Sequence, residues 1–420
     1  MRRLTLGDDP AAVVAALREP AAPGLDIERT VREILDDVRA RGDDAVRAHA
    51  LRLDGVEPAP RYGVPPSVLR AALAAAAPEL RGALELAAAN IRAYHSRELP
   101  LAWRQTLAQG QVVGQEIVAL GVAGMYVPGG LADYPSSVLM TAVPAQVAGV
   151  GRIVVCSPPR SGGGVAAGVA AAWALLGVTD LYPIGGAQAI AAMAFGTAVV
   201  PRCDVIVGPG NAYVTEAKRQ VMGEVRIDGL AGPSEVLIVA DAEGRADWLA
   251  ADLLAQAEHG AGAMAALLDV GGELGDRVCD AVAQLSAELG LPTDRIAVVT
   301  CRDPAAALEL VNAFAPEHLE LHLADAAALV PRVRNAGAIF VGARAATAFG
   351  DYAAGTNHVL PTGGSARFGQ GLSASDFVKR VAVVELDAAA ASALAEPVAT
   401  IAAEEGLRSH ARSARLRALP

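Results

Sequence analysis

A carboxylate and an imidazole stand side by side at Glu317 and His318, directly after a loop that ends in Pro316. Proton transfer needs one group that accepts a proton and one that gives it up, and this pair provides both. An ordinary pair of surface charges is the alternative explanation. His322 follows His318 at the even spacing of a strand, where it could simply pack. We take Glu317 and His318 as the candidate acid–base pair.

Other polar groups suited to a metal ion fall in three short segments. Gln256 and His259 are three residues apart on a predicted helix and therefore share one face. A hydrogen-bonded helix end is the simpler explanation of that pair taken alone. Nitrogen and oxygen ligands without a thiolate favour Zn²⁺ with an exchangeable coordination position, or Mn²⁺ or Co²⁺ in its place. The two remaining segments contain the other candidates: Asp351, His358, Glu405 and His410.

Three glycine-containing loops follow predicted strands and precede predicted helices. They are Tyr126-Val-Pro-Gly-Gly130, Gly185-Gly-Ala-Gln188 and Gly208-Pro-Gly-Asn211. Ordinary turn chemistry would explain any one of them. Open α/β sheets bind ligands at the carboxyl ends of their strands, so three such loops in successive units predict a shared ligand cleft. Free helix N-termini in that cleft would suit a pyrophosphate.

A glycine motif elsewhere resembles the dinucleotide-binding fingerprint without its context. Gly162 to Ala167 fits G-x-G-x-x-A, and Asp180 follows at a suitable distance. The fingerprint requires its glycines directly after the strand and its acid at the end of the next strand. Here Ser157–Ser161 intervenes, and Asp180 precedes its strand. A plain loop before a helix is the better interpretation.

The elements that must position these groups follow an alternating α/β pattern. Residues 1–110 have helical periodicity, as in Ile27–Ala48 and Pro66–Ser96. Two series of short β-branched runs follow, separated by helical stretches such as Arg245–Glu258, and this pattern is typical of parallel sheets covered on both faces. The predicted strands are Gly121–Val127, Arg152–Cys156, Asp180–Ile184, Asp204–Val207, Glu235–Ala240, Met264–Val270, Arg295–Thr300 and Ala338–Val341. Beyond Lys379–Leu386 we expect helix to the end of the chain.

Composition excludes several classes of protein. The 420 residues are 53% hydrophobic and 19% charged, which argues against a disordered chain. A net charge of −11 argues against binding to nucleic acid, because phosphate contacts need clustered basic residues. The charge-free stretches raise a membrane alternative, but Gly and Pro interrupt each of them. Four widely spaced cysteines predict free thiols in a reducing compartment, so we expect a cytoplasmic protein that does not bind membranes.

Together these motifs strongly resemble the histidinol dehydrogenase family, from about residue 25 to the C-terminus. The most specific block runs from Ile227-Asp-Gly-Leu-Ala-Gly-Pro-Ser234 to Asp241 and continues to Gln256-Ala-Glu-His259. The other matching blocks occur in the family's order. They are Tyr126-Val-Pro-Gly-Gly, Tyr134-Pro-Ser-Ser-Val-Leu-Met140, Gly185-Gly-Ala-Gln-Ala-Ile-Ala191, Ala315-Pro-Glu-His-Leu319, Gly355-Thr-Asn-His-Val-Leu-Pro361 and Glu405-Gly-Leu-Arg-Ser-His410.

The resemblance implies a role for each candidate. It makes Glu317 and His318 the acid–base pair. One Zn²⁺ per subunit would be held by Gln256, His259 and Asp351, with His410 supplied by the partner subunit. NAD⁺ would contact Tyr126, Gln188 and Asn211. The substrate-binding positions would be Ser234, Gln256, His259, Glu317, His318, Asp351, His358, Glu405 and His410.

The resemblance also implies an intertwined homodimer with two incomplete Rossmann-like parallel-sheet domains, a helical N-terminal arm and a short C-terminal helical domain. The expected division is residues 1–24 for the arm, 25–120 plus 234–378 for the first domain, 121–233 for the NAD-binding domain, and 379–420 for the dimerisation tail. The chain departs from the family at Thr141, Gln146 and Val112–Leu120, which could alter cofactor affinity.

The implied reaction is the NAD⁺-dependent four-electron oxidation of L-histidinol to L-histidine through L-histidinaldehyde, the last steps of histidine biosynthesis. A sister dehydrogenase that acts on another polar alcohol is one alternative. A zinc hydrolase in which Glu317 activates water is a second, and a non-catalytic binding module is a third. Cys156 and Cys203 have no base partner in these motifs, which argues against a thiol nucleophile.

Overall fold

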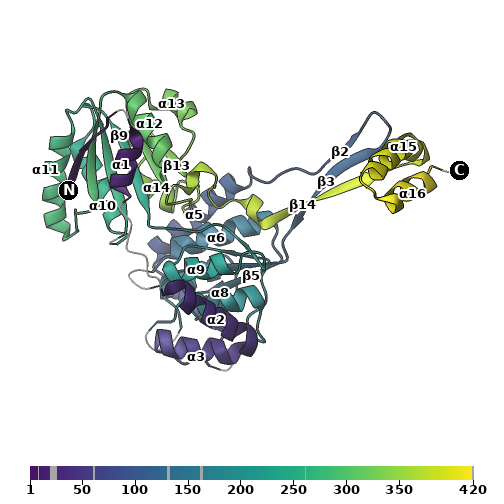
Figure 1. The fold of residues 1–420 in the computed structure, drawn as a ribbon. Helices are drawn as coiled ribbons and strands as arrows, with labels where there is room; N and C mark the ends of the chain where they lie inside the picture. Colours follow the sequence, from purple (N-terminus) through teal and green to yellow (C-terminus); the bar gives the residue numbers. More distant parts are fainter. Residues whose placement is uncertain are drawn as a thin grey trace.

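The computed structural model describes residues 1–7, 9–18, 26–59, 62–129, 133–160, 164–260 and 262–418. Gly130, Gly162 and Gly163 of the predicted loops lie outside these residues. Two α/β lobes lie against each other, and a long arm projects from them to the C-terminal helices (Figure 1). Within the described residues, no helix is long and apolar enough to cross a membrane.

The first lobe contains a six-stranded parallel sheet, sheet A, in which every strand pair is parallel. One face is covered by α1 (Pro10–Leu17) and α12 (Pro304–Phe314), and the other by α10 (Ala246–Ala257) and α11 (Gly275–Leu289). In spatial order the strands are β1 (Arg2–Thr5), β11 (Ile296–Cys301), β10 (Met264–Val270), β9 (Glu235–Ala240), β12 (His318–His322) and β13 (Ala338–Val341). Short helices α13 (Ala326–Leu329) and α14 (Thr347–Tyr352) follow β12 and β13.

The second lobe contains a five-stranded parallel sheet, sheet C. Its strands in spatial order are β6 (Asp180–Tyr182), β5 (Arg152–Cys156), β4 (Val122–Tyr126), β7 (Val205–Val207) and β8 (Arg226–Ile227). Two apolar clusters pack against it, one of which includes residues of α2 (Ile27–Arg41), α3 (Asp43–Asp54), α8 (Gly186–Phe195) and α9 (Ala212–Gln220). The other includes residues of α4 (Pro66–Ala75), α5 (Pro78–His95), α6 (Pro135–Ala148) and α7 (Ala167–Leu175).

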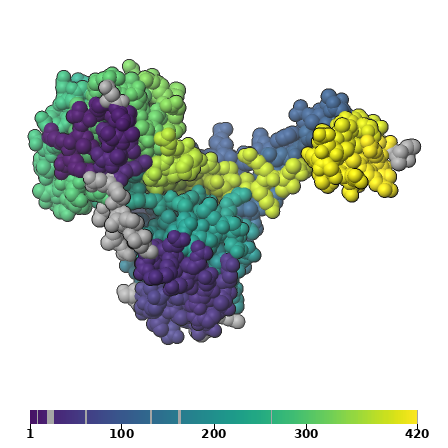
Figure 2. Space-filling model, in the orientation of Figure 1, coloured from purple at the N-terminus to yellow at the C-terminus, as the bar shows by residue number. Residues whose placement is uncertain are grey.

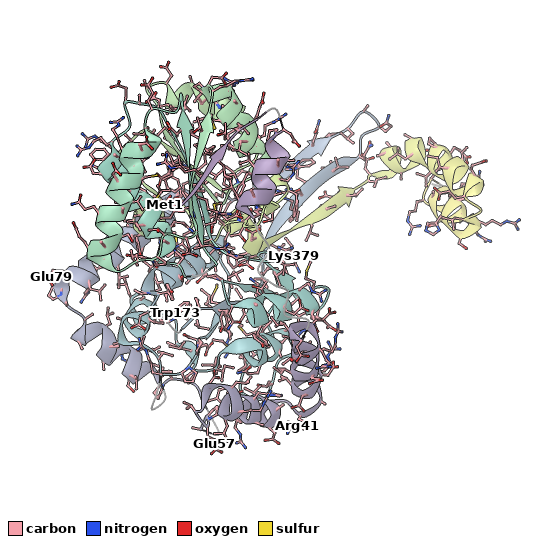
Figure 3. All side chains as sticks on the ribbon, turned by 60° about the vertical axis from the view of Figure 1, so that its left-hand side comes forward. Met1, Arg41, Glu57, Glu79, Trp173 and Lys379 are labelled. Atoms are coloured by element: carbon pink, nitrogen blue, oxygen red, sulfur yellow. The ribbon has the colours of Figure 1, made fainter. Side chains whose placement is uncertain are left out.

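The arm is a three-stranded antiparallel ribbon that ends in two helices. Its strands are β2 (Trp103–Thr106), β3 (Val112–Ala119) and β14 (Val378–Glu385), and β3 lies in the middle. The helices α15 (Ala388–Glu404) and α16 (Arg408–Leu416) pack on each other at its far end. The space-filling view shows them well separated from both lobes (Figure 2), and the rotated view shows the same projection beyond Lys379 (Figure 3).

The two parallel-sheet units predicted from the sequence are confirmed, and all eight strands that were predicted are present. Strands β1, β2, β3 and β8 were not foreseen. The helices also group differently from the expected domain division. Helices α2 to α5, which the sequence analysis joined to residues 234–378, pack on the helices of sheet C instead. Helical periodicity identifies the buried face of a helix but not the sheet that will cover it.

Candidate active site

The predicted acid–base pair lies at the junction between α12 and β12. The helix ends at Phe314, and Ala315 takes a left-handed conformation with φ of 54°. Among the described residues it is the one non-glycine residue with a positive φ. Such a conformation is costly for a residue with a Cβ atom, so the surrounding packing must enforce it. This turn places Glu317 and His318 at the amino end of a fully buried strand.

Glu317 is held by the residues that begin the neighbouring strand, β9. The Ser234 hydroxyl donates to Glu317 Oε2 at 2.6 Å, and the backbone N–H of Glu235 donates to the same oxygen at 2.9 Å. Both bonds use Oε2, which leaves Oε1 for another proton donor. Burial raises the pKa of the Glu317 carboxyl above its ordinary value, and His318 and the two hydrogen bonds oppose that shift. The carboxyl is thus rigidly placed and tuned toward accepting a proton.

His318 is oriented by its other ring nitrogen. Nδ1 lies 3.1 Å from the Glu235 carbonyl oxygen, which can only accept, so Nδ1 carries a proton and Nε2 is the ring nitrogen that gains or loses the second one. Nε2 is buried without a hydrogen-bond partner and lies 3.6 Å from Asp351 Oδ1. Burial alone would lower the pKa of His318, but the carboxylates of Glu317 and Asp351 outweigh it and raise the pKa to about 9.

Three predicted metal or substrate ligands converge beside His318. Asp351 ends α14, and the charges of both His259 and His358 act on its carboxylate. His358 Nδ1 donates to the Asp351 carbonyl at 2.9 Å, and its Nε2 lies 3.2 Å from the Ser137 hydroxyl. His259 Nδ1 lies 3.3 Å from the Ala255 carbonyl. Each imidazole therefore uses Nδ1 on a backbone carbonyl, which leaves Nε2 of His259 for a ligand, while Nε2 of His358 contacts the Ser137 hydroxyl.

Gln256 completes the group that this chain can supply. Its side chain is only 3% exposed, and Nε2 has no hydrogen-bond partner although burying an amide without one is costly. A buried amide, an imidazole at His259 and a carboxylate at Asp351 are donors that suit Zn²⁺, Mn²⁺ or Co²⁺. The residues present therefore fit a divalent cation. They are three donors, so a tetrahedral site would need one more.

The remaining predicted ligands are not brought to this site by their own chain. Glu405 follows α15 and His410 lies on α16, both exposed at the far end of the arm (Figure 1). Within the described residues, one protomer does not bring its own Glu405 or His410 to Gln256, His259 and Asp351, and the predicted supply by a partner subunit stays a prediction.

The predicted cofactor residues line one cavity. Tyr126, Gln188 and Asn211 surround a space of about 480 Å³ at the carboxyl ends of strands in sheet C. The Gly186 N–H donates to the Tyr126 phenol oxygen at 3.1 Å, so the phenol proton remains free to donate. Gln188 Oε1 is buried without a partner. Asn211 caps α9 with its Oδ1, which leaves its amide group for a ligand.

A second cavity of about 800 Å³ lies next to the first. It is lined by Asn211, which also lines the first cavity, and by Ser234 and His259. Ser234 directly precedes β9, so this cavity lies at the amino end of a strand of sheet A, whereas the first lies at carboxyl ends of strands in sheet C. The sequence analysis expected ligands at carboxyl ends only, and that expectation stays a prediction.

Of the glycine motif, the described residues 164–167 line neither cavity. Strand β5 ends at Cys156, α7 begins at Ala167, and Asp180 opens β6, where it pairs with Arg152 at 2.6 Å. The interpretation as a plain loop is consistent with these positions.

The departures from the family pattern have packing roles. Thr141 is buried in α6 and donates to the Ser137 carbonyl at 2.7 Å. Gln146 bonds to Arg92 of α5 and to the Leu176 carbonyl. Residues 112–120 form β3 of the arm and its end. None of these lines the cavity that holds Tyr126 and Gln188.

The cysteines are unsuited to nucleophilic attack. Burial raises the pKa of Cys156 well above its ordinary value, and burial raises those of Cys203 and Cys301 to about 12. The thiolate is the reactive form, so these groups stay inert near neutral pH.

The sequence analysis missed a buried polar cluster behind the site. Asp252, Glu320 and His322 place their ligand-type atoms within 4.8 Å of one another. Among the described residues this is the one group of three such side chains close enough to hold a metal ion. The even spacing of His318, Glu320 and His322 in a strand was the signal that could have revealed it.

Comparison with known proteins agrees with this geometry. The family model described as histidinol dehydrogenase matches residues 18–418. The chain belongs to the histidinol dehydrogenase family. It is 47% identical to the histidinol dehydrogenase of Rhizobium meliloti (strain 1021), over 97% of this chain and 95% of that protein. It is 45% identical to the enzyme of Pseudomonas aeruginosa, over 94% and 91% of the two chains.

A solved structure shows the same family relationship in three dimensions. The crystal structure of histidinol dehydrogenase from Elizabethkingia anophelis superposes with a TM-score of 0.93 at 30% sequence identity. It covers 99% of this chain and 98% of that chain. The two lobes and the arm described above are therefore the fold of this family of oxidoreductases.

The cofactor cavity generates a first prediction. Replacing Gln188 by Leu, which keeps the shape and removes the polar atoms, should raise KM for NAD⁺ about fivefold through the loss of about 1 kcal/mol of hydrogen bonding. Steady-state kinetics at saturating alcohol measure this. Gln220→Leu is the matched control, because Gln220 bonds to Glu28 and Glu216 on the outside of α9. Equal KM values for both variants would contradict the assignment.

Proposed function

We propose that this chain oxidises L-histidinol to L-histidine with two molecules of NAD⁺ and one of water, through L-histidinaldehyde held in the site. The products are L-histidine, two NADH and protons. The observation that carries the proposal is the position of two adjacent cavities that share Asn211 in their lining. One is lined by Tyr126, Gln188 and Asn211, and the other brings Ser234 and His259 next to the Glu317–His318 pair.

His318 is the base for the alcohol proton. Its Nε2 lone pair faces the site, while Nδ1 is fixed on the Glu235 carbonyl. The base must be neutral, yet Glu317 and Asp351 help to raise the pKa of His318. With Asp351 engaged by a cation, its negative charge is compensated and the pKa of His318 falls toward the range of a working base.

Glu317 activates the water that attacks the aldehyde. Ser234 and the Glu235 N–H hold one carboxylate oxygen, so the other is presented in a fixed direction. A raised pKa makes this carboxylate a stronger base than an exposed glutamate. Hydration turns the aldehyde into a diol, from which a second NAD⁺ accepts hydride. Retaining the aldehyde in a closed site prevents its reaction with amines.

Gln256, His259 and Asp351 would hold the divalent cation, with His410 of a partner subunit as the fourth ligand. Bound there, the cation supplies a fixed positive charge that orients the amino and imidazole nitrogens of histidinol. His358 and Glu405 would contact the same substrate. The family's zinc is the metal we expect, and the donor set would also accept Mn²⁺ or Co²⁺.

The chain would act as a homodimer with shared sites. The arm exposes apolar side chains that a monomer would leave in water, including Val384 at 63% and Ile401 at 63% exposure. A partner's lobe would cover them and receive Glu405 and His410. We place the enzyme in the cytoplasm, which agrees with four free cysteines.

The alternative functions are less well supported. A zinc hydrolase would not need a cofactor cavity such as the one around Gln188. A dehydrogenase for a different polar alcohol would not need the additional imidazole- and amine-binding groups at His358 and Glu405. A panel of polar alcohols in an NAD⁺ reduction assay distinguishes these functions, and two NADH per histidinol consumed is the result we expect.

Chelation should abolish activity, because three protein donors and the partner's fourth are then left without the cation that orients the substrate. Addition of Zn²⁺, Mn²⁺ or Co²⁺ should restore it. The measurement is NADH formation in protein whose metal content has been determined. Full activity of verified metal-free protein would contradict the proposed metal site.

The two catalytic groups should separate by half-reaction. Glu317→Gln should slow oxidation of supplied histidinaldehyde by about 10²–10⁴-fold and slow alcohol oxidation much less, because only the aldehyde step needs an activated water. His318→Asn should impair alcohol oxidation. Single-turnover NADH formation from each substrate measures both effects. Equal losses in the two half-reactions would show that this division of roles is incorrect.

Shared sites should allow complementation between inactive variants. His410→Ala and a Gln256→Ala/His259→Ala double variant are unfolded and refolded together. About half of the dimers should then be mixed, each with one intact site, so activity should reach roughly one quarter of the wild-type value. A mixture as inactive as its parents, beside a wild-type control that recovers, would exclude a ligand supplied in trans.

A further inference from the structure

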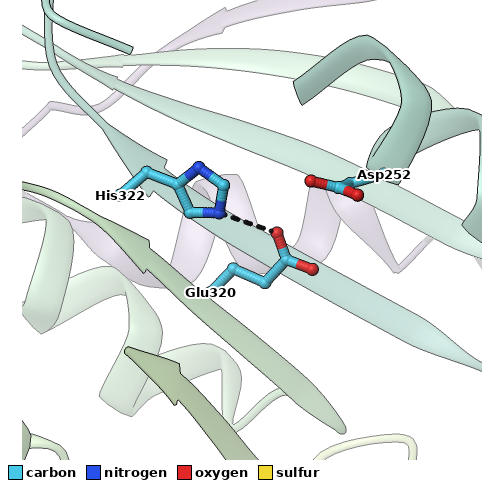
Figure 4. Close-up of side chains that lie close together, drawn as sticks. All are labelled: Asp252, Glu320 and His322. Carbon is cyan, nitrogen blue, oxygen red and sulfur yellow. Dashed lines mark hydrogen bonds and ion pairs between the residues drawn. The ribbon is translucent and has the colours of Figure 1, made fainter. Parts of the chain in front are cut away.

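A second polar cluster lies on the same strand as His318. In β12 the side chains of His318, Glu320 and His322 share one face, while Leu319 and Leu321 enter the apolar core on the other. Asp252 of α10 faces the last two from the covering helix (Figure 4). Glu320 and His322 are buried, so each polar atom there must find a partner.

Glu320 connects the elements around it. Its Oε1 accepts hydrogen bonds from the Thr347 N–H at 2.7 Å and the Thr347 hydroxyl at 2.8 Å, at the first residue of α14. Its Oε2 pairs with His322 Nε2 at 3.1 Å. The carboxyl of Asp252 lies beside this pair, with an oxygen within 4.8 Å of ligand-type atoms of Glu320 and His322. Burial and the charge of Glu320 raise the pKa of Asp252 to about 7.

Each connected element carries a residue of the proposed site at close range. Gln256 lies four residues after Asp252 on α10, and Asp351 lies four residues after Thr347 on α14. Four residues span about 6 Å along a helix and return to the same face. His318 is two residues before Glu320 on the same face of β12. A shift of Glu320 would therefore displace three site residues at once.

The polar atoms of the cluster have partners within the protein. Among the described residues, no side-chain atom of Asp252, Glu320 or His322 is buried without a hydrogen-bond partner, since Glu320 bonds to His322 and Thr347 and Asp252 lies beside them. In the proposed site, by contrast, Gln256 Nε2 and His318 Nε2 are buried without partners. The contacts of the cluster connect β12 to the elements packed beside it.

We propose that Asp252, Glu320 and His322 form a hydrogen-bonded brace that holds Gln256 and Asp351 at the spacing that the catalytic cation requires. The inference rests on the proposed function, in which these two residues are ligands. The three are positioning residues: they touch neither substrate nor cofactor, and they act through α10 and α14. Outer partners of metal ligands commonly contribute 10- to 100-fold to metal affinity.

The test compares two buried carboxylates of sheet A. Glu320 caps α14, and Asp269 caps α11 by accepting from the N–H groups of Leu274 and Gly275 at 3.2 and 2.8 Å. Helix α11 carries none of the site residues. Glu320→Ala and Asp269→Ala should both lower Tm. Only Glu320→Ala should weaken Zn²⁺ binding, by about 10- to 100-fold in competition with a chelator, and shift the visible spectrum of the Co²⁺-substituted protein.

Milder changes keep the test decisive if Glu320→Ala does not fold. Thr347→Val removes one donor to Glu320 and should weaken Zn²⁺ binding, whereas Thr347→Ser should restore it. Glu320→Gln keeps an acceptor for Thr347 and offers a donor to Asp252, so its metal affinity should stay close to that of the wild type. Unchanged metal affinity in Glu320→Ala or Thr347→Val would overturn the brace, as would an equal loss in Asp269→Ala.

Two further measurements separate the possible failures. Asp351→Ala is titrated with Zn²⁺ first: unchanged affinity there would refute the proposed metal site itself, independently of the brace. Metal content of the purified wild-type dimer is then determined. One ion per chain is expected. Two ions per chain, with one lost in Glu320→Ala, would show that the cluster binds metal and would overturn its role as a support.

Discussion

The active site depends on the free-energy cost of burying polar groups on one face of a strand. His318, Glu320 and His322 occupy the inner face of β12, which sits between β9 and β13 in a parallel sheet. Buried groups of this kind are tolerated only when each is paired. Their partners belong to β9, α10 and α14. The contacts that these buried side chains require therefore fix the elements that carry Ser234, Gln256 and Asp351. The contacts that stabilise these buried side chains thus also position the residues of the proposed site.

The two lobes contribute opposite edges of their sheets to one cavity. Sheet C offers the carboxyl ends of its strands, where helix N-termini and small residues suit a dinucleotide. Sheet A contributes the amino ends of β9 and β12, where Glu317 accepts hydrogen bonds from the Ser234 hydroxyl and the Glu235 N–H. Asn211 lies where the two spaces meet. In the proposed function, this arrangement brings NAD⁺, the hydride acceptor, close to the base His318 without a complete dinucleotide-binding domain.

The arm carries two of the proposed site residues away from the lobes of their own chain. Its ribbon carries Glu405 and His410 far from the residues they are proposed to join (Figure 1). A site that takes a ligand from a second copy is complete only in the assembled enzyme. In the proposed function, three donors in the lobe would position the cation and the fourth would make the chemistry depend on dimerisation. The arm exposes apolar side chains that such an association would cover.

The sequence by itself determined the type and position of most elements and supplied the candidates for the site residues. Strands such as Arg152–Cys156 follow from local apolar runs, and the pairing of Glu317 with His318 is covalent adjacency. What it could not determine is which helices cover which sheet, or that β1 joins sheet A. It also could not show that Asp252, 68 residues before Glu320, would lie beside it and have a raised pKa. Periodicity is a local property of the chain, whereas burial, pairing and pKa shifts arise only when distant segments exclude water together.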